Sequence, residues 1–299
     1  MANHVITAPM APTMDGKMVL ITGGNSGLGK ASSISLANKG ANLTLLCRNR
    51  EKADAAIADI SSTSGRKPDL IIADMLLQRD VRRAASEFLS THSRLDVLLN
   101  NAGSNFLSHK ETEDGIERTM ALNYFSQFLF TNLLLETLKR SAPARIVNVS
   151  SNGHYGAKLD LESIKGGGRM GPDGLGAYGR SKLALVLFTY ELARRLQGTG
   201  VTANCLHPGV VRTNIWSHAG PFSPLTILAS RFFMSPEEGA KTQVYLASSP
   251  EVEGVTGKYF DKCKPKKSSP ESYDEAMAAR LWEISERVTG LAASAARTH

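Results

Sequence analysis

Tyr178 and Lys182 stand four residues apart in the stretch Tyr-Gly-Arg-Ser-Lys. On a helix this spacing places both side chains on one face. A tyrosine has a pKa near 10, which is too high for efficient proton transfer at neutral pH. An ammonium about 4 Å away, at an effective dielectric constant of about 20, favours the phenolate by about 4 kcal/mol. We therefore expect Lys182 to bring the pKa of Tyr178 towards neutrality, so that Tyr178 serves as a general acid and base.

A hydroxyl that could hold a substrate carbonyl lies in the pair Ser150-Ser151, directly after the apolar run 145–149. Open α/β sheets bind ligands at the carboxyl ends of their strands, which is where this pair is expected. His207 also follows an apolar run, and we interpret it as structural. His154 and Tyr155 are open to two interpretations, as pocket-lining residues or as ordinary loop residues.

The stretch Thr22-Gly-Gly-Asn-Ser-Gly-Leu-Gly29 lies between a short apolar run and a segment with helical spacing. Glycines in that context allow a tight turn and close approach of a diphosphate to the backbone, at a helix N-terminus with unpaired N–H groups. We predict a dinucleotide site whose first contacts are Gly23, Asn25, Ser26, Gly27, Leu28 and Gly29.

The second apolar run ends at Cys47-Arg48, without the carboxylate that usually binds the ribose 2′-hydroxyl of NAD. An arginine there pairs with a 2′-phosphate, which a carboxylate would repel. The sequence therefore predicts NADP(H), with Asn49 and Lys52 as helpers of Arg48.

Short apolar runs alternate with helical segments along the chain, which is typical of βαβ units and a parallel sheet. We expect strands at 18–21, 43–46, 70–73, 95–99, 145–149, 201–206 and 258–260. We expect helices at 27–38, 51–60, 80–89, 116–138, 177–196, 236–246 and 272–288. The prediction is a single Rossmann-type, doubly wound α/β domain, with a mostly parallel seven-stranded sheet and helices on both faces.

The domain is expected to span 17–290, between a flexible N-terminal tail (1–16) and a C-terminal tail (291–299). Two long segments interrupt the alternation: 152–176, which is rich in glycine, and 214–234, which is apolar and contains proline. Long loops in compact α/β domains are usually functional. We interpret 214–234 as a lid-like insertion, with a subunit interface and a membrane contact as the alternatives.

Composition narrows the class of protein. The 299 residues are 42% hydrophobic and 21% charged, which argues against general disorder. Three cysteines provide no disulfide framework and no metal-ligand spacing, and they favour a reducing, cytoplasmic setting. We find no signal peptide and no transmembrane segment. The net charge is +7, but the densest basic run, 262–267, is interpreted as an exposed loop, and no nucleic-acid partner is expected.

Taken in order, these motifs resemble the short-chain dehydrogenase/reductase family over nearly the whole chain. The landmarks are Thr22-Gly-x3-Gly-x-Gly29, Asp74, Asn100-Asn-Ala-Gly103, Asn123, Ser150-Ser151, Tyr178-x3-Lys182 and His207-Pro-Gly-x3-Thr213. The resemblance implies four catalytic residues: Tyr178 as proton donor, Ser151 as carbonyl anchor, Lys182 as holder of the nicotinamide ribose, and Asn123 as the residue that positions Lys182 through water. It implies further cofactor contacts from Asp74, Met75, Asn101, Ala102, Gly103, Pro208, Gly209, Val211 and Thr213. No metal is implied.

The chain is most similar to the retinol-dehydrogenase-like branch, through 47–53, 146–151, 188–196 and 279–285. The similarity implies an NADP(H)-dependent oxidoreductase that interconverts a carbonyl and an alcohol on a lipophilic or bulky small molecule. A remote alternative is a protochlorophyllide-reductase-like enzyme. The rival class is a non-catalytic dinucleotide-binding sensor or scaffold, against which the presence of all four catalytic residues argues. Homo-oligomers are common in this family, although the sequence shows no interface pattern.

Overall fold

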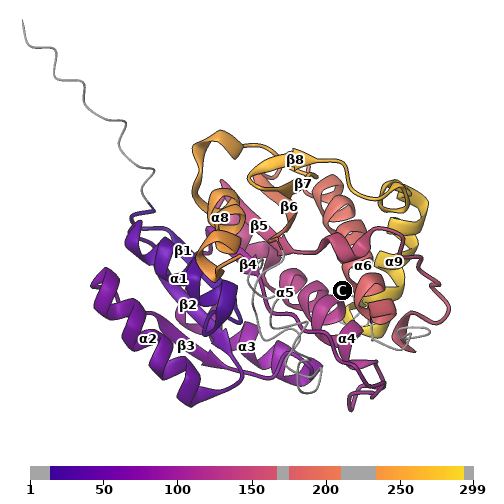
Figure 1. The fold of residues 1–299 in the computed structure, drawn as a ribbon, viewed down its shortest axis with the longest axis horizontal. Coiled ribbons are helices and arrows are strands. Elements are labelled where there is room, and N and C mark those ends of the chain that lie inside the picture. Colours follow the sequence, from indigo (N-terminus) through magenta and orange to yellow (C-terminus); the bar gives the residue numbers. More distant parts are fainter. Residues whose placement is uncertain (1–13, 167–174, 210–233, 293–299) are drawn as a thin grey trace, which may run out of the picture.

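A computed structural model describes residues 14–166, 175–209 and 234–292, which form an α/β domain around one sheet (Figure 1). Its strands run in the order β3-β2-β1-β4-β5-β6-β7-β8, and all neighbours pair in parallel except β7 and β8. The strands are β1 (Met18–Thr22), β2 (Asn42–Cys47), β3 (Asp69–Ile72), β4 (Val97–Asn100), β5 (Ala144–Val149), β6 (Val201–His207), β7 (Tyr259–Asp261) and β8 (Lys264–Lys266). The predicted doubly wound, mostly parallel sheet is confirmed.

Helices cover both faces of the sheet (Figure 1). One layer contains α1 (Gly27–Asn38), α2 (Arg50–Ser64) and α8 (Pro236–Ser248), which share an apolar core with one face of the strands. The other layer contains α3 (Gln78–Thr91), α4 (Arg118–Met120), α5 (Ser126–Arg140), α6 (Leu175–Arg195) and α9 (Glu275–Val288). Its core is aromatic, with Phe128, Phe188 and Trp282 in mutual ring contact.

Within the described residues the sheet has eight strands, where the sequence predicted seven. The additional strand, β8, lies in the basic run 262–267, which was predicted to be a loop. Lys262 and Cys263 adopt positive φ angles and reverse the chain, so that β8 pairs antiparallel with β7 at the sheet edge. The side chains of β8 are exposed, as predicted for this run, and lysines on an edge strand discourage pairing with another chain.

The predicted helix 116–138 is interrupted. After α4, a π-helical turn spans Ala121–Phe125 and leads directly into α5. Such turns insert one extra residue per turn and often mark functional positions. Here the turn contains Asn123.

Because the strands are parallel, the segments that follow β1, β4, β5 and β6 meet at one edge of the sheet. These segments are the glycine-rich turn, 101–103, Ser150-Ser151 and 208–209. At the N-terminus, Met14 is buried and its N–H donates to the Lys39 carbonyl (2.7 Å), so the described fold begins before residue 17.

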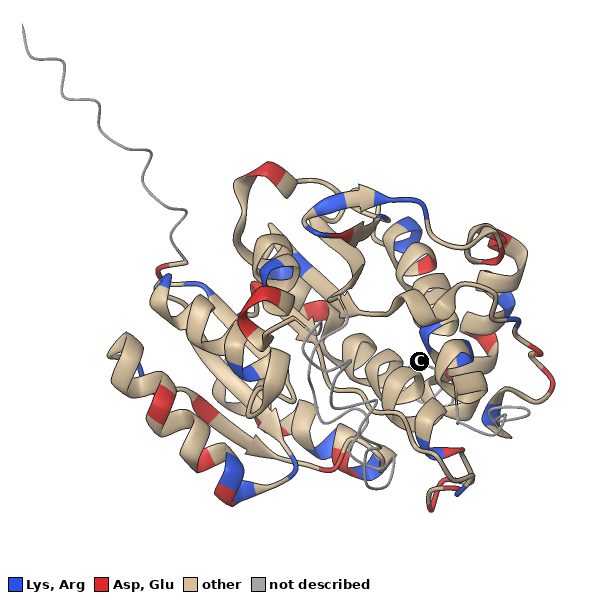
Figure 2. Ribbon diagram, viewed as in Figure 1, with Lys and Arg blue, Asp and Glu red and all other residues tan. Residues whose placement is uncertain are grey.

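Charged residues of both signs occur along most of the helices (Figure 2). Among the described residues, no helix combines the length and apolar composition that a membrane span requires.

Candidate active site

The glycine-rich turn between β1 and α1 is packed too tightly for side chains. Gly23 has φ +67°, a left-handed conformation that favours glycine. A Cβ atom on Gly29 would overlap the Gly23 carbonyl oxygen and lie 2.6 Å from Asn101 Nδ2. The turn therefore presents bare backbone to the edge of the sheet.

The first turn of α1 keeps its N–H groups available. Ser26 is the N-cap residue, but its side chain makes no capping hydrogen bond, and no acidic residue lies in the first turn. Asn25 is half-buried, Ser26 is exposed, and Leu28 is buried under the turn. Unpaired N–H groups at the positive end of a 12-residue helix suit a diphosphate.

Thr22, at the end of β1, fixes the neighbouring segment after β4. Its Oγ1 accepts hydrogen bonds from the N–H groups of Asn101 (3.0 Å) and Ala102 (2.9 Å). Asn101 Nδ2 donates in return to the Thr22 carbonyl (3.0 Å), and Gln127 Nε2 donates to the Ala102 carbonyl (2.7 Å). Sequence reasoning did not assign Thr22 and Gln127 as site residues, because their roles depend on contacts between distant segments.

Arg48 lies at the end of β2 with an exposed side chain, and its Nη1 is 3.9 Å from Asp74 Oδ2. Asn49 caps α2 by accepting the Lys52 N–H (2.8 Å), so the amide of Asn49 already has a structural role. Asp74 Oδ1 accepts the Leu76 N–H (3.0 Å), and Met75 is buried. Lys52, which was predicted to assist Arg48 in binding a 2′-phosphate, is exposed at the start of α2.

The predicted tyrosine–lysine pair lies in the first half of α6, and both side chains are buried. Lys182 Nζ donates to the Val149 carbonyl (2.8 Å), at the end of β5. The same Nζ is 5.6 Å from the centroid of the Tyr178 ring. The two side chains therefore share a helix face, as the spacing predicted.

The pKa of Tyr178 is shifted in the direction opposite to the one predicted from the sequence. Burial raises the pKa of Tyr178, and the hydrogen bond with Ser151 lowers it only in part. Burial also lowers the pKa of Lys182 to about 7. The physical reason is that burial removes the hydration of the phenolate and of the ammonium, which disfavours both charged forms.

The two serines after β5 have different partners. Ser150 is buried and its Oγ donates to the Lys182 carbonyl (3.0 Å), which ties β5 to α6. Ser151 is half-buried, and its Oγ accepts the Gly153 N–H (3.1 Å), which leaves its proton available. Ser151 is therefore the serine with a hydroxyl proton to offer, and its side chain is within hydrogen-bonding reach of Tyr178.

Asn123 is fully buried in the π-helical turn. Its Nδ2 donates to the Ser104 carbonyl (2.9 Å) and to Ser181 Oγ (3.0 Å), and its Oδ1 accepts the Ser104 N–H (2.9 Å). A Cβ on Gly103 would lie 3.1 Å from Asn123 Oδ1 and 3.3 Å from Lys182 Nζ. Gly103 thus separates the asparagine from the lysine, and the four residues proposed as catalytic from the sequence lie in one cluster.

The segment after β6 borders the same cluster. His207 Nδ1 accepts the Asn152 N–H (3.2 Å), and burial lowers the pKa of His207 to about 4, so it is a neutral structural acceptor. Pro208 and Gly209 are half-buried, and Gly209 has φ +87°. Val211, Thr213 and nearly all of the proposed lid 214–234 lie outside the described residues.

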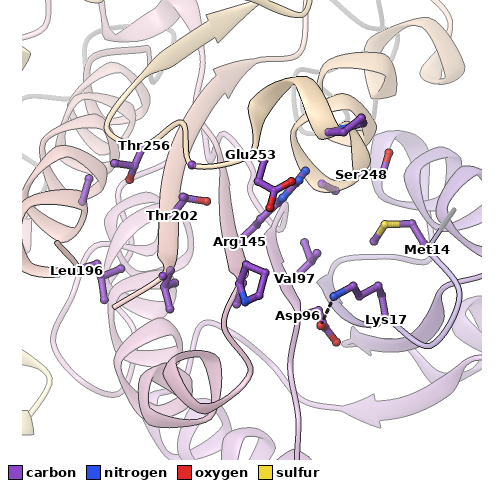
Figure 3. A pocket seen from close by; sticks show the side chains of 18 of the residues that line it. Met14, Lys17, Asp96, Val97, Arg145, Leu196, Thr202, Ser248, Glu253 and Thr256 are labelled. Carbon is purple, nitrogen blue, oxygen red and sulfur yellow. Dashed lines mark hydrogen bonds and ion pairs between the residues drawn. The ribbon is translucent and has the colours of Figure 1, made fainter. Parts of the chain in front are cut away.

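A cavity of about 740 Å³ lies at the opposite, amino edge of the sheet (Figure 3). Three of its charged side chains have partners within the protein: Lys17 Nζ is 3.0 Å from Asp96 Oδ1, and Arg145 Nη1 donates to the Ser249 carbonyl (2.8 Å) after α8. We find no chemistry-bearing cluster in this cavity. Across the part of the chain that the structure describes, no three His, Cys, Asp or Glu side chains are grouped to hold a metal ion.

Comparison with known proteins agrees with this geometry. The family model described as "short chain dehydrogenase" matches residues 17–222. The chain is 43% identical over 297 residues to retinol dehydrogenase 13 of Homo sapiens, covering 97% of this chain and 89% of that protein. It is 44% identical over 295 residues to retinol dehydrogenase 14 of Mus musculus, covering 93% and 87%.

Solved structures show the same fold. An uncharacterised protein from Mycobacterium paratuberculosis superposes with a TM-score of 0.76 at 32% identity, over 93% of this chain and 95% of that one. RhlG of Pseudomonas aeruginosa, solved as a complex with NADP, gives a TM-score of 0.68 at 27% identity, over 84% and 96%. The fold and the site define a nicotinamide-dinucleotide oxidoreductase. The chain belongs to the short-chain dehydrogenase family.

Gly29→Ala tests the close packing of the turn. Because the new Cβ would overlap the Gly23 carbonyl, we expect the affinity for dinucleotide to fall by roughly tenfold or more, about 1.4 kcal/mol. Fluorescence titration with NADPH measures this. Gly166→Ala is the matched control, since a Cβ there meets no atom within 4 Å. Equal affinities for the two variants would contradict the close packing.

Lys182→Met tests how much the burial of a charged lysine lowers the free energy of unfolding. In the folded protein, burial lowers the pKa of Lys182 from 10.5 to about 7. The charged lysine therefore reduces the free energy of unfolding by its full amount below pH 7, and this loss of stability disappears as the pH rises to 10.5. At about pH 6 we expect the variant to gain roughly 2–4 kcal/mol in free energy of unfolding, allowing for the lost hydrogen bond. Denaturant unfolding should show this gain shrinking towards pH 10.

The control for that experiment is Lys139→Met, because Lys139 is a surface residue paired with Glu136. Its free energy of unfolding should change by no more than about 0.5 kcal/mol at any pH. If Lys182→Met were less stable than the wild type at pH 6, or if its gain in free energy of unfolding did not depend on pH, the lowered pKa of Lys182 would be refuted.

Proposed function

We propose that this protein is an NADP(H)-dependent oxidoreductase that interconverts a carbonyl and an alcohol on a lipophilic or bulky small molecule. The observation that carries the proposal is the buried cluster of Asn123, Tyr178 and Lys182, with Ser151 beside it at the carboxyl edge of the sheet. The fold alone would suit many functions, but this set of side chains suits proton transfer to and from a substrate oxygen.

The residues of this site fit a dinucleotide. The bare backbone of the glycine-rich turn and the uncapped N-terminus of α1 suit a diphosphate. Arg48 would hold the 2′-phosphate, Asp74 and Met75 would border the adenine, and Lys182 would hold the nicotinamide ribose. The remaining contacts would come from Gly23, Asn25, Ser26, Gly27, Leu28, Gly29, Asn101, Ala102, Gly103, Pro208, Gly209, Val211 and Thr213, with Asn49 and Lys52 near the phosphate.

When bound, the coenzyme supplies the hydride for the carbonyl carbon or accepts it in the reverse direction. In reduction, Tyr178 transfers its phenolic proton to the carbonyl oxygen, and the Ser151 hydroxyl donates a hydrogen bond to the same oxygen. The raised pKa of Tyr178 keeps the phenol protonated until the oxygen becomes basic. Asn123 joins the π-helical turn to the segment after β4 through Ser104 and to α6 through Ser181.

The names of the relatives, which are retinol dehydrogenases, support a proposal for the substrate class. We propose a lipophilic alcohol or aldehyde as substrate, handled in the cytoplasm. A panel of retinoids, aliphatic aldehydes, ketones and alcohols, followed by NADPH absorbance, tests this. Tight NADPH binding without turnover of any panel member would favour a dinucleotide sensor or scaffold instead.

Tyr178→Phe should remove the transferable proton while the lysine keeps its place. We expect turnover to fall by roughly a hundredfold or more, the scale of general acid–base catalysis, with NADPH affinity within a few-fold of wild type. Tyr245→Phe is the control, because that hydroxyl lies on α8 and donates to Glu251 (2.9 Å). Steady-state rates decide the matter, and near-normal turnover of Tyr178→Phe would overturn the mechanism.

Arg48→Asp should shift the coenzyme preference from NADPH towards NADH. A charge-assisted bond to the 2′-phosphate is worth roughly 1.5–3 kcal/mol, so its loss should weaken NADPH binding by roughly ten- to a hundredfold. The new carboxylate adds repulsion against the phosphate. The Arg48–Asp74 contact is long and exposed, so little stability should be lost.

The measurement is kcat/KM for both coenzymes at fixed ionic strength, with Arg50→Asp as the control for a charge change nearby. A wild-type preference for NADH would show that Arg48 does not read the phosphate. The same conclusion would follow if both variants lost NADPH activity equally.

A further inference from the structure

His154 is a buried histidine for which the proposed mechanism has no use. It lies three residues after Ser151, at the end of a 3₁₀ turn, Asn152–His154, and its side chain is fully buried. A buried imidazole requires partners for both ring nitrogens, or it destabilises the fold. Both partners are present, and they lie far apart in the sequence.

The two partners define the protonation state of the ring. Nδ1 is 2.6 Å from the Ser151 carbonyl oxygen, which can only accept, and Nε2 is 3.0 Å from the Ser269 backbone nitrogen, which can only donate. The ring is therefore neutral, with its proton on Nδ1. In this form it donates to the serine carbonyl and accepts from Ser269.

The surroundings of the ring preserve the neutral form. Burial lowers the pKa of His154, opposed by the Ser151 hydrogen bond and by Glu271, and Lys266 lowers it further. The rings of Tyr155 and Tyr259 pack against the imidazole, with centroids 4.2 and 4.8 Å away. A second ring proton would face the Ser269 N–H, donor against donor.

Ser269 belongs to the segment Ser268–Tyr273, which is fixed to α6. Tyr190 of α6 hydrogen-bonds Ser268 Oγ (2.7 Å) and stacks on the Tyr273 ring at 5.5 Å. Tyr178 lies on the same helix. His154 thus connects the backbone of Ser151 to a segment that the tyrosine-bearing helix holds.

The turn has a second support. Tyr259 donates to Asn152 Oδ1 (2.9 Å), and the Asn152 N–H donates to His207 Nδ1 (3.2 Å). These contacts hold Asn152 but not the Ser151 carbonyl. Among the described residues, the Ser151 carbonyl accepts hydrogen bonds from two groups, the backbone N–H of His154 (3.2 Å) and the His154 ring.

We propose that His154 is a positioning residue for catalysis: its Nδ1–H holds the Ser151 carbonyl, and so aims the Ser151 hydroxyl at the substrate oxygen beside Tyr178. The inference rests on the proposed role of Ser151 and extends it to a residue that touches no reacting atom. Misplacing a catalytic group by about 1 Å can cost roughly a hundredfold in rate.

Two substitutions separate the two ring nitrogens. His154→Asn keeps a donor near the position of Nδ1 and removes the acceptor for Ser269. His154→Gln keeps an acceptor near the position of Nε2 and removes the donor to Ser151. We expect kcat of His154→Asn to stay within about threefold of wild type, and kcat of His154→Gln to fall by roughly ten- to a hundredfold, with the KM for NADPH within about twofold.

Amide hydrogen exchange provides a readout that does not depend on turnover. The Gly153 N–H, which donates to Ser151 Oγ, should exchange faster in His154→Gln only. The Ser269 N–H should exchange faster in His154→Asn only. In the wild type, ¹⁵N shifts of the His154 ring should show a protonated Nδ1 and a bare Nε2, whether or not either variant folds.

Equal losses of kcat in the two variants, normal kcat in His154→Gln, or a protonated Nε2 in the wild type would overturn the proposal. If no panel substrate is turned over by the wild type, the proposed function fails. The exchange pattern at Gly153 then still decides whether His154 positions Ser151.

Discussion

The boundary between α6 and β5 is joined by hydrogen bonds, and the arrangement of the site depends on them. Lys182 Nζ donates to the Val149 carbonyl, and Ser150 Oγ donates to the Lys182 carbonyl, so helix and strand are tied in both directions. Further along the same boundary, Asn148 Nδ2 of β5 donates to Thr189 Oγ1 of α6 (2.9 Å). Apolar packing alone tolerates small slides of a helix over a sheet, whereas these bonds fix the height of Tyr178 above Ser151.

The burial of Lys182 and Tyr178 at the same boundary disfavours the charged form of each side chain. A lysine that is buried against a backbone carbonyl loses hydration in its charged form, and a phenol beside it loses hydration in its ionised form. Groups of this kind cluster at functional sites, because the environment that shifts their pKa values also prepares them for proton transfer. Ordinary core packing would have been satisfied by methionine and phenylalanine at these two positions.

Much of the fold could be predicted from the sequence, because its signals are local. The limits of α1 (Gly27–Asn38) were predicted to the residue, and each expected strand was found within a few residues of its place. The strand β8 was missed, because its formation depends on the positive φ angles of Lys262 and Cys263, which glycine usually supplies. The π-helical turn at Asn123 was also missed, since it follows from contacts with Ser104 and Ser181 on other segments.

The site could be predicted only in outline. The spacing correctly predicted that Tyr178 and Lys182 share a helix face. The direction of the Tyr178 pKa shift was not predicted correctly, because the dielectric constant that we assumed is typical of a protein surface. How deeply the two side chains are buried depends on the tertiary structure and cannot be seen in the local sequence. The role of His154 depends on Ser269, which lies far away in the sequence, so neither interpretation of His154 as a loop residue or a pocket residue anticipated it.

The proposed function requires that hydride passes between a nicotinamide coenzyme and a substrate carbon within this site. The most direct measurement is mass spectrometry of the product formed from a lipophilic aldehyde and NADPH deuterated at the transferring position. We expect one deuterium on the carbinol carbon of the product alcohol, and we expect Tyr178→Phe to form this deuterated alcohol more slowly than the wild type by roughly a hundredfold or more. An alcohol product without deuterium, or formation of the deuterated alcohol by Tyr178→Phe at the wild-type rate, would contradict the proposed hydride transfer.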